Sequence, residues 1–205
     1  MGGPHIEALR ISPNYTSRDW ERLSCASEAD WHSAAAIVKD RLHGRFIRYA
    51  DDAILSEFSG FIVLAVDSLV METLQQFREG YIKEWGDSER MIKECLKGHR
   101  FQPAFDALAR KRYYKDIRCG LLHQAEAKRM WLVRRGEPAI LQRWPDKKGY
   151  TIDVKLFHQA VNDSLSDYLD DVVRPEKNDL RDNLWKKMGN ICSVRRLRGA
   201  EYAAD

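Results

Sequence analysis

The chain has little net charge, few cysteines and no long apolar run, and each shortage excludes a class of protein. Its 205 residues carry a formal net charge of only +3, so an RNA site would have to come from local clustering of cations. The longest apolar run, Phe61 to Val66, is too short to span a bilayer and ends at Asp67, which predicts a core segment and no membrane partner. The four cysteines are widely scattered, so neither a metal site nor a disulfide framework is expected.

The same features indicate where the protein resides and how it is organised. Lone thiols suit a reducing cytosol, and the start from Met1 to Ile6 lacks the basic-then-apolar pattern of a signal peptide. We therefore expect a cytoplasmic protein. No internal repeat or low-complexity segment divides the chain, and its length suits one domain with a real core, so we predict a single domain over residues 1–205.

Apolar residues at helical spacing predict a mainly α fold. The strongest predicted helix runs from about Glu57 to Gly80; it is apolar nearly all round, so it should lie at the centre of a bundle, and Gly80 should end it. Asp30 and Asp153 are the expected N-caps of two others, and Pro175 should open the last. The predicted helices cover residues 31–42, 57–80, 91–96, 104–117, 153–172 and a final segment from 175 onward.

Three short runs between the later helices are rich in β-forming residues. They are Trp131–Val133, Ile140–Leu141 and Tyr150–Ile152, and turn-forming segments separate them. We predict a small three-stranded antiparallel β-meander inserted at about 129–152. This leaves a helical core at about 30–126 and 153–173 and a C-terminal helical extension at 174–205.

Two carboxylates interrupt the apolar helix at 57–80. Asp67 and Glu72 each have two interpretations. Either both lie near the edge of the core and accept hydrogen bonds from neighbours, as buried carboxylates usually do, or one of them orients an active-site side chain.

The segment with the clearest chemical potential contains Arg118 and His123. Five residues turn a regular helix through about 500°, so the two side chains would point about 140° apart. They would converge if the helix bends between them, which Gly120 makes easier, or if a symmetric partner supplies the second copy. The alternative from the residues alone is that His123 is a core or interface histidine and Arg118 a surface ion-pair residue.

An arginine and a histidine together suit RNA cleavage by the adjacent 2′-hydroxyl. Histidine can accept or donate a proton near neutral pH, and arginine offers a permanently charged fork to phosphate oxygens. Neither group needs a metal or another cofactor, so none is predicted. Cations around the motif form a possible RNA track, with a solvated helix face as the alternative. They are Arg110, Lys111, Arg112, Lys115, Lys128 and Arg129, followed by Arg134 and Arg135. Tyr113, Tyr114 and Trp131 could stack on bases or belong to the core.

The stretches "FIVLAVDSLVMETLQQFREG" and "YYKDIRCGLLHQAEAK" together resemble bacterial HEPN-domain proteins. The resemblance covers roughly Trp31 to Glu126, with the helix 153–172 as the closing helix. It implies a HEPN-like bundle of four to five helices and a homodimer in which two Arg-x4-His motifs face each other. It also implies metal-independent endoribonuclease activity, as in toxins and anti-phage defence effectors, with Arg118 and His123 as the catalytic pair. RNA and an antitoxin or defence-system protein are the implied partners.

The chain departs from the HEPN pattern at two positions. Cys119 follows the arginine where many active members have a polar residue, and Gln124 follows the histidine where toxins silenced by nucleotidyltransferases have a tyrosine. Cys119, Glu72, Asp67 and Tyr114 are the expected supporting residues. An inactive HEPN module that binds RNA or nucleotide, or a dimerising scaffold, is the second hypothesis; a plain helical interaction protein is the third.

Overall fold

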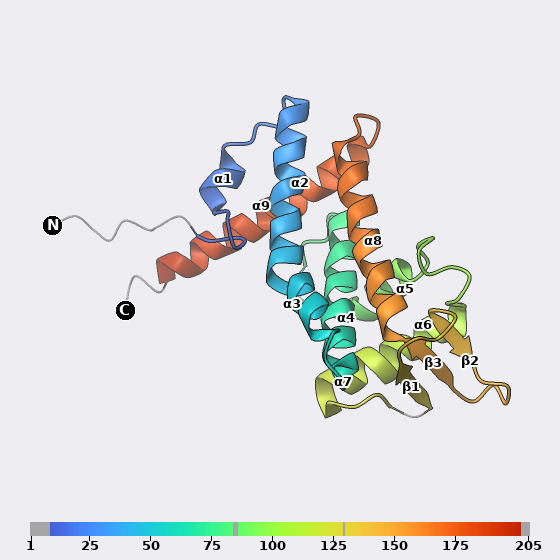
Figure 1. Cartoon of the computed structure of the whole chain (residues 1–205). Coiled ribbons are helices and arrows are strands. Elements are labelled where there is room, and N and C mark those ends of the chain that lie inside the picture. The colour runs from blue at the N-terminus through green and yellow to red at the C-terminus, as the bar shows by residue number, and fades with distance from the viewer. Residues whose placement is uncertain (1–8, 84–85, 129, 202–205) are drawn as a thin grey trace. The chain divides into compact units, whose positions relative to one another are not determined.

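The computed structural model describes residues 9–83, 86–128 and 130–201, with side chains through residue 193. Figure 1 shows a mainly helical chain with one small sheet, as predicted. In chain order the elements are α1 (Ser17–Glu21), α2 (Glu28–Leu42), η1 (His43–Ile47), α3 (Arg48–Ala53), α4 (Gly60–Arg78), α5 (Ser88–Cys95), α6 (Ala107–Arg112), η2 (Tyr113–Arg118), α7 (Cys119–Gln124), β1 (Trp131–Arg134), β2 (Leu141–Arg143), β3 (Tyr150–Asp153), α8 (Val154–Val173) and α9 (Asn178–Glu201). The segments η1 and η2 are π-helical turns.

The described residues form two compact units. Unit 1 comprises residues 9–45, 76–83 and 168–201, and unit 2 comprises residues 46–75 and 86–167. The prediction of a single domain stays a prediction.

Unit 1 is centred on tryptophans from three different helices. The ring of Trp185 on α9 lies 4.7 Å from that of Trp20 on α1 and 6.1 Å from that of Trp31 on α2. The guanidinium of Arg181 lies over the ring of Trp31 at 4.8 Å and donates to both carboxylate oxygens of Glu28. Aromatic contacts of this kind contribute beyond the area that they bury, so α9 is fixed to α1 and α2.

Gly80 ends helix α4 as predicted. Its φ of +59° is left-handed, its N–H donates to Phe77 O, and the next N–H, of Tyr81, donates to Gln76 O. This pair of bonds is the Schellman arrangement that glycine favours after a helix. Asn183 of α9 packs directly on Gly80 and donates to the carbonyl of Arg78, so the end of α4 is tied to α9 within unit 1.

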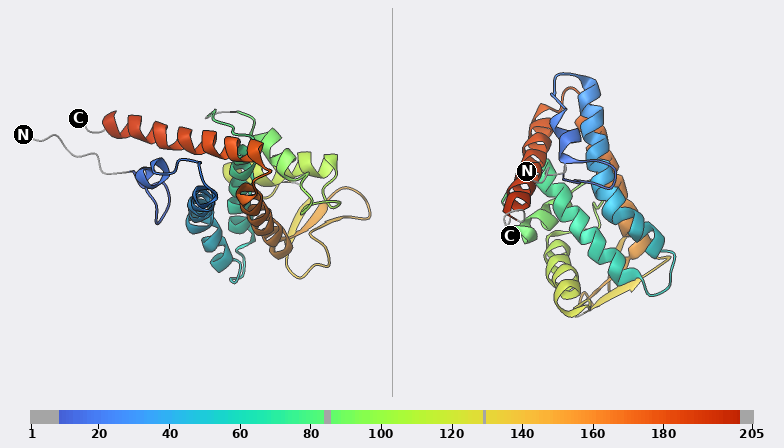
Figure 2. Two further views of the ribbon diagram at one scale, coloured as in Figure 1. Left: turned by 90° about the horizontal axis from the view of Figure 1, so that it is seen from above. Right: turned by 90° about the vertical axis from the view of Figure 1, so that its left-hand side faces the viewer.

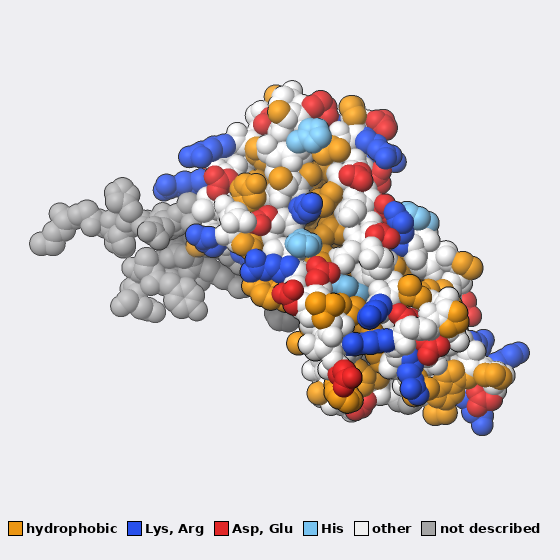
Figure 3. All heavy atoms as spheres, viewed as in Figure 1, with side chains coloured by type: hydrophobic (Ala, Val, Ile, Leu, Met, Phe, Trp, Pro, Cys, Tyr) orange, Lys and Arg blue, Asp and Glu red, His pale blue; other side chains and the backbone are white. Residues whose placement is uncertain are grey.

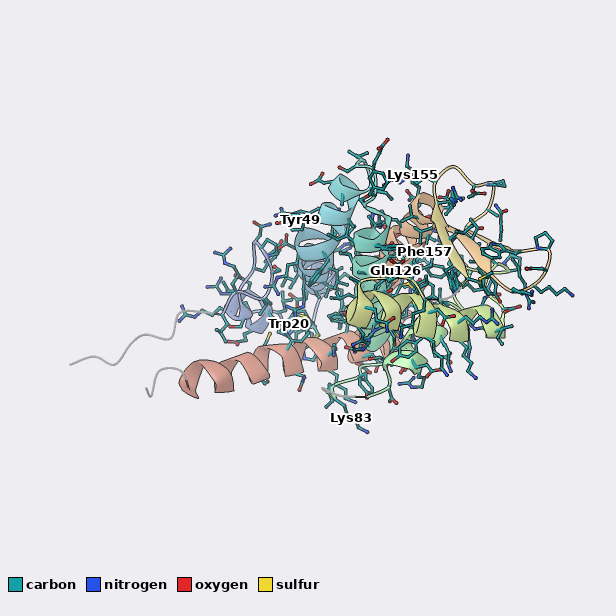
Figure 4. The ribbon with its side chains drawn as sticks, turned by 90° about the horizontal axis from the view of Figure 1, so that it is seen from below. Trp20, Tyr49, Lys83, Glu126, Lys155 and Phe157 are labelled. Atoms are coloured by element: carbon teal, nitrogen blue, oxygen red, sulfur yellow. The ribbon has the colours of Figure 1, made fainter. Side chains whose placement is uncertain are left out.

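Unit 2 has an aromatic core beneath α8. Tyr113 stacks on Phe157 at 5.2 Å, and Phe105 and Trp131 meet Tyr113 edge-on at 6.0 and 6.3 Å. Phe157 lies on the inner side of α8, whereas Lys155 projects away from it (Figure 4). This core joins the π turn η2, the sheet and α8.

The sheet is mixed and not the predicted antiparallel meander. Its order is β1-β3-β2, with β1 parallel and β2 antiparallel to β3. The reason is burial: β3 has Tyr150, Ile152 and Asp153 buried and takes the centre, where both of its edges are paired. A meander would place the more exposed β2 there. The carboxylate of Asp153 accepts the N–H of Glu137 at 2.8 Å and fixes the crossing connection between β1 and β2.

Helix boundaries match the predictions in part. Asp153 caps α8, because its Oδ1 accepts the N–H of Leu156 at 2.8 Å. The prediction of Asp30 as a cap is wrong, since Ser27 is the N-cap of α2 and its hydroxyl accepts the N–H of Asp30. The start of the last helix at Pro175 is also wrong, since α9 begins at Asn178 and Pro175 lies in the preceding turn.

Among the described residues, α4 is the helix long and apolar enough to span a membrane by length and composition. The core helix of a soluble protein meets the same criteria, so this is weak evidence for a membrane segment. The fully buried carboxylate of Asp67 lies midway along α4 and is bonded to His158 of α8, as in a protein core.

Gly80→Ala should lower the free energy of unfolding by about 1–2 kcal/mol, because a left-handed backbone costs this much for a residue with a Cβ, before the contact with Asn183 is added. Gly189→Ala in α9 is the matched control. Nothing lies within 4 Å of its Cβ, and helix propensity should raise the free energy by up to about 1 kcal/mol. Urea denaturation followed by circular dichroism measures both. Equal effects of the two substitutions would contradict the account of Gly80.

Candidate functional site

Arg118 is the last residue of a π turn within one continuous helix. Elements α6, η2 and α7 follow one another without a break (Figure 2). π turns interrupt helices frequently at functional sites. From Cys119 to Gln124 the helix is regular, so it does not bend between Arg118 and His123, and the two side chains diverge by about 140°. One copy of the helix therefore does not bring both groups to one face.

Gly120 has a different role from the predicted one. A Cβ there would lie 2.4 Å from the carbonyl oxygen of Glu126, since the segment after α7 folds back onto the helix. In that segment the N–H of Lys128 donates to the carbonyl of Asp116 at 2.8 Å. The glycine permits this close approach and leaves the helix straight.

Arg118 is paired with Glu72, and Glu72 is held by Ser88. Nη2 of Arg118 donates to Oε2 of Glu72 at 3.0 Å, and the hydroxyl of Ser88 donates to Oε1 at 2.6 Å. The side chains of Arg118 and Glu72 are 20% and 16% exposed. One carboxylate of α4 thus connects η2 with the start of α5. Glu72 lies near the edge of the core and accepts hydrogen bonds from two neighbours, as in the first of its two predicted roles, and one of these donors is Arg118.

A shallow hollow of about 470 Å³ lies beside this pair. Ser88, Glu89, Arg90 and Lys93 of α5 line it together with Gly86, Asp87 and Tyr114, so its walls carry charges of both signs. The guanidinium of Arg118 lies 5.7 Å from the centre of the Tyr114 ring. Burial raises the pKa of Tyr114, and a hydrogen bond with Cys119 adds to the effect, so the phenol stays protonated. Cys119 therefore contacts Tyr114 and is half-buried.

His123 is exposed in the last turn of α7. Within the described part of the chain, no hydrogen bond or ion pair engages its ring. The helix ends two residues later at Ala125, whose φ is +53°. The interpretation of His123 as a core histidine is therefore wrong, and its ring faces solvent in a single copy of the chain.

The predicted RNA-binding cations do not form one uniform face. Arg110 and Arg112 donate to the carbonyls of Phe105 and Lys148, so both guanidinium groups have structural partners. Lys111 and Lys115 are exposed, and Lys128 is half-buried. Arg129 lies outside the described residues.

Two aromatic residues considered for base stacking belong to the core. Tyr113 is fully buried and its hydroxyl bonds that of Ser68 at 2.9 Å. Trp131 is 7% exposed and donates from its ring nitrogen toward Asp116 at 3.4 Å. Tyr114 is the aromatic residue of this group that reaches a surface hollow.

Asp67 lies away from Arg118, in a separate network within unit 2. His158 of α8 bonds Oδ1 of Asp67 through Nδ1 at 2.7 Å and Oδ1 of Asp51 through Nε2 at 3.0 Å. Oδ2 of Asp67 has no hydrogen-bond partner among the described residues, and the side chain is fully buried. Asp67 and Glu72 are five positions apart on α4 and so point about 140° apart. Asp67 thus joins the core and does not meet Arg118.

Burial sets the charges of this network. Burial raises the pKa of Asp67 to about 6, although the hydrogen bond from His158 opposes the shift. Burial alone would lower the pKa of His158, but the bonds and charges of Asp67 and Asp51 outweigh it and raise the pKa above its usual value. Both ring nitrogens face carboxylate oxygens, which favours the doubly protonated ring.

Sequence reasoning missed Ser88 and His158. Nothing in the sequence connects Ser88 with Glu72, sixteen positions earlier. A signal existed for His158, since it lies one turn from Val154 and Val161 on the apolar stripe of α8. A histidine on such a stripe is buried and needs polar partners.

No family model, curated protein or solved structure matches this chain. The interpretation of the site therefore depends on the geometry of Arg118, Glu72, Ser88 and Tyr114 and on the exposed His123.

The double variant Asp67→Asn/His158→Gln should flatten the dependence of stability on pH. Both groups have a folded pKa above their unfolded value, so the stabilisation is complete at low pH. It is lost as pH rises through about 6 for Asp67 and through the raised pKa of His158. The melting temperature of the natural protein should fall more from pH 5 to pH 9 than that of the double variant.

His32→Gln, at an exposed position, is the control and should keep the dependence of the natural protein. Parallel pH curves for the natural protein and the double variant would show that the network does not titrate as described.

Proposed function

We propose that this protein is a metal-independent endoribonuclease of the HEPN type, active as a homodimer, with Arg118 and His123 as its catalytic residues. The observation that carries the proposal is Arg118 itself: its guanidinium is bonded to Glu72, its side chain is 20% exposed, and it lies next to Tyr114, which lines a polar hollow. An arginine that is already held in this way loses little further conformational freedom when it binds a phosphate. His123 follows on the same helix with an exposed ring.

The proposed reaction uses the 2′-hydroxyl of RNA as the nucleophile. One imidazole removes the 2′ proton, O2′ attacks the phosphorus, and the bond from phosphorus to O5′ breaks. A second acid group protonates O5′, so the products are a 2′,3′-cyclic phosphate and a 5′-hydroxyl. Arg118 stabilises the charge on the pentacoordinate phosphate. Its pairing with Glu72 uses Nη2, and the other N–H groups of the fork remain for phosphate oxygens.

The divergence of Arg118 and His123 supports a dimer. Because a regular helix separates them by about 140°, a second copy is needed for two histidines and two arginines to share one cleft. Leu122, beside His123, is 57% exposed, which is apolar surface that a second copy would cover. In this arrangement Lys111 and Lys115 would contact the RNA backbone outside the cleft.

Cys119 and Tyr114 would help to position Arg118 without contacting the RNA. Cys119 contacts Tyr114, whose ring lies 5.7 Å from the guanidinium of Arg118. Cys119 thus has a positioning role that needs no strong donor. A toxin or an anti-phage defence effector is the biological role that we propose for such an enzyme, in the cytoplasm and with an antitoxin or defence-system protein as partner.

The purified protein should cleave RNA in the presence of EDTA and leave 2′,3′-cyclic phosphate ends. His123→Ala should reduce cleavage at least about 100-fold, because general acid–base groups contribute this much or more. The assay resolves labelled RNA on gels and measures melting temperature and sedimentation in parallel. His32→Ala is the control. Unchanged cleavage by His123→Ala would refute the assignment, and RNA binding without cleavage would identify the inactive module.

Glu72→Gln should lower kcat about 100-fold while KM changes little, because a misplaced catalytic group costs about this factor. Ser88→Ala removes one hydrogen bond to Glu72 and should lower kcat about fivefold, which corresponds to about 1 kcal/mol.

Glu94→Gln, which changes a carboxylate of the same helix that pairs with Lys97 and does not line the hollow, is the matched control. If Glu72→Gln instead raised kcat, Glu72 would inhibit Arg118 by occupying its guanidinium, and it would not be a positioning residue.

A further inference from the structure

The loop before α4 exposes two apolar side chains to solvent. Phe58 is 97% exposed and Leu55 is 81% exposed. The backbone of Phe58 is left-handed, with φ at +62°, which is rare for a residue with a bulky side chain. Such a conformation persists only where the surroundings impose it. The left-handed backbone at Phe58 is therefore held in place by neighbouring contacts.

Arg135, just after β1, fixes this loop. Its guanidinium donates to the carbonyl of Ser56 and, at 2.6 Å, to the hydroxyl of Ser59. The two bonds bracket Phe58 in the sequence. The loop is thus fastened on both sides of the aromatic residue.

A cleft of about 640 Å³ opens beside the loop. We call it the Phe58 cleft. Its apolar lining comprises Phe58, Phe61, Val133 and Val154, and its charged lining comprises Arg134 and Arg135. Figure 3 shows apolar and basic side chains intermixed over this end of unit 2, where Figure 1 has the start of α4 and β1. This pocket is more apolar than the hollow beside Ser88.

The cleft carries two positive charges, and one of the two arginines has no side-chain partner among the described residues. Arg135 is occupied by the loop, whereas Arg134 is exposed and makes no hydrogen bond or ion pair within the part of the chain that the structure describes. The exposed Glu57 precedes Phe58 but does not line the cleft. An apolar trough next to a free guanidinium is complementary to an apolar group beside a carboxylate.

We propose that the Phe58 cleft is a docking site for a peptide segment of a partner protein that carries a bulky apolar side chain next to an acidic residue. The apolar side chain enters between Phe58, Phe61 and Val133. The carboxylate takes the planar fork of Arg134 in two N–H···O bonds. This site is independent of the proposed ribonuclease activity, since none of its lining residues belongs to the Arg118 site.

A second copy of this chain is a poorer occupant of the cleft. A second copy would have to present an apolar side chain next to a free carboxylate at the matching position of the same interface. A membrane surface is also disfavoured, because stable attachment to anionic lipid takes several clustered cations and this cleft has one free guanidinium. A peptide with one acidic residue needs only one free guanidinium and no symmetry between the partners.

Fluorescence polarisation with two labelled peptides tests the proposal. One 12-residue peptide contains phenylalanine and leucine alternating with aspartate, and its match has lysine at every aspartate position. The aspartate peptide should bind the full-length protein at least tenfold more tightly, and added salt should weaken it. Arg134→Glu should reverse the preference, and Phe58→Ala should weaken binding of the aspartate peptide about tenfold.

Controls separate the cleft from general stickiness and from unfolding. Arg22→Glu and Leu108→Ala change exposed residues outside the cleft and should leave both affinities unchanged. Circular dichroism melts check that Phe58→Ala and Arg134→Glu remain folded, as expected for exposed side chains. RNA cleavage by Phe58→Ala should equal that of the natural protein, so a failure of this proposal is distinct from a failure of the ribonuclease proposal.

Three results would overturn the docking site. The first is no preference for the aspartate peptide, or a preference that Arg134→Glu does not change. The second is a dimer in sedimentation experiments that Phe58→Ala dissociates, which would assign the cleft to a second copy. The third is binding to phosphatidylserine vesicles that is lost in Phe58→Ala while neither peptide binds, which would assign it to a membrane surface.

Discussion

A carboxylate that is taken out of water on an apolar helix has to receive donors from other parts of the chain, and α4 carries two such groups. Asp67 and Glu72 point in different directions, so each attracts different partners. Asp67 is bonded to His158 of α8, and Glu72 is bonded to Arg118 of η2 and Ser88 of α5. These two sets of bonds connect α4 with α8, η2 and α5 within unit 2.

The helix that carries Arg118 is shaped by its surroundings at two points. The π turn η2 buries Tyr113 among Phe105, Phe157 and Trp131, and it ends at Arg118, whose guanidinium meets Glu72. Gly120 then lets the returning chain lie directly on the helix, which leads into β1. A wide turn that anchors an aromatic core on one side thus presents a charged group on the other.

The two surfaces that we single out in unit 2 differ in chemistry. The hollow near Arg118 is lined by polar and charged residues of both signs, and Arg118, which pairs with Glu72, lies next to its Tyr114 wall. The Phe58 cleft is apolar with one unoccupied guanidinium, which suits stable docking of an amphipathic segment. An effector that cleaves RNA and is controlled by another protein would use both.

The sequence alone was sufficient to predict most of the helices, because apolar spacing, a terminating glycine such as Gly80 and a cap such as Asp153 are local features of the chain. It also pointed to Arg118 through its spacing from His123, to Glu72 as a carboxylate on an apolar helix, and to Tyr114 as an aromatic residue beside the motif, and their roles stay predictions. Only the tertiary structure decided the strand order, the pairing of Glu72 with both Arg118 and Ser88, and the burial of Tyr113 and Trp131. The physical reason is that hydrogen bonds and packing between distant segments depend on how elements meet in space. The spacing of residues along the chain does not determine which distant segments meet.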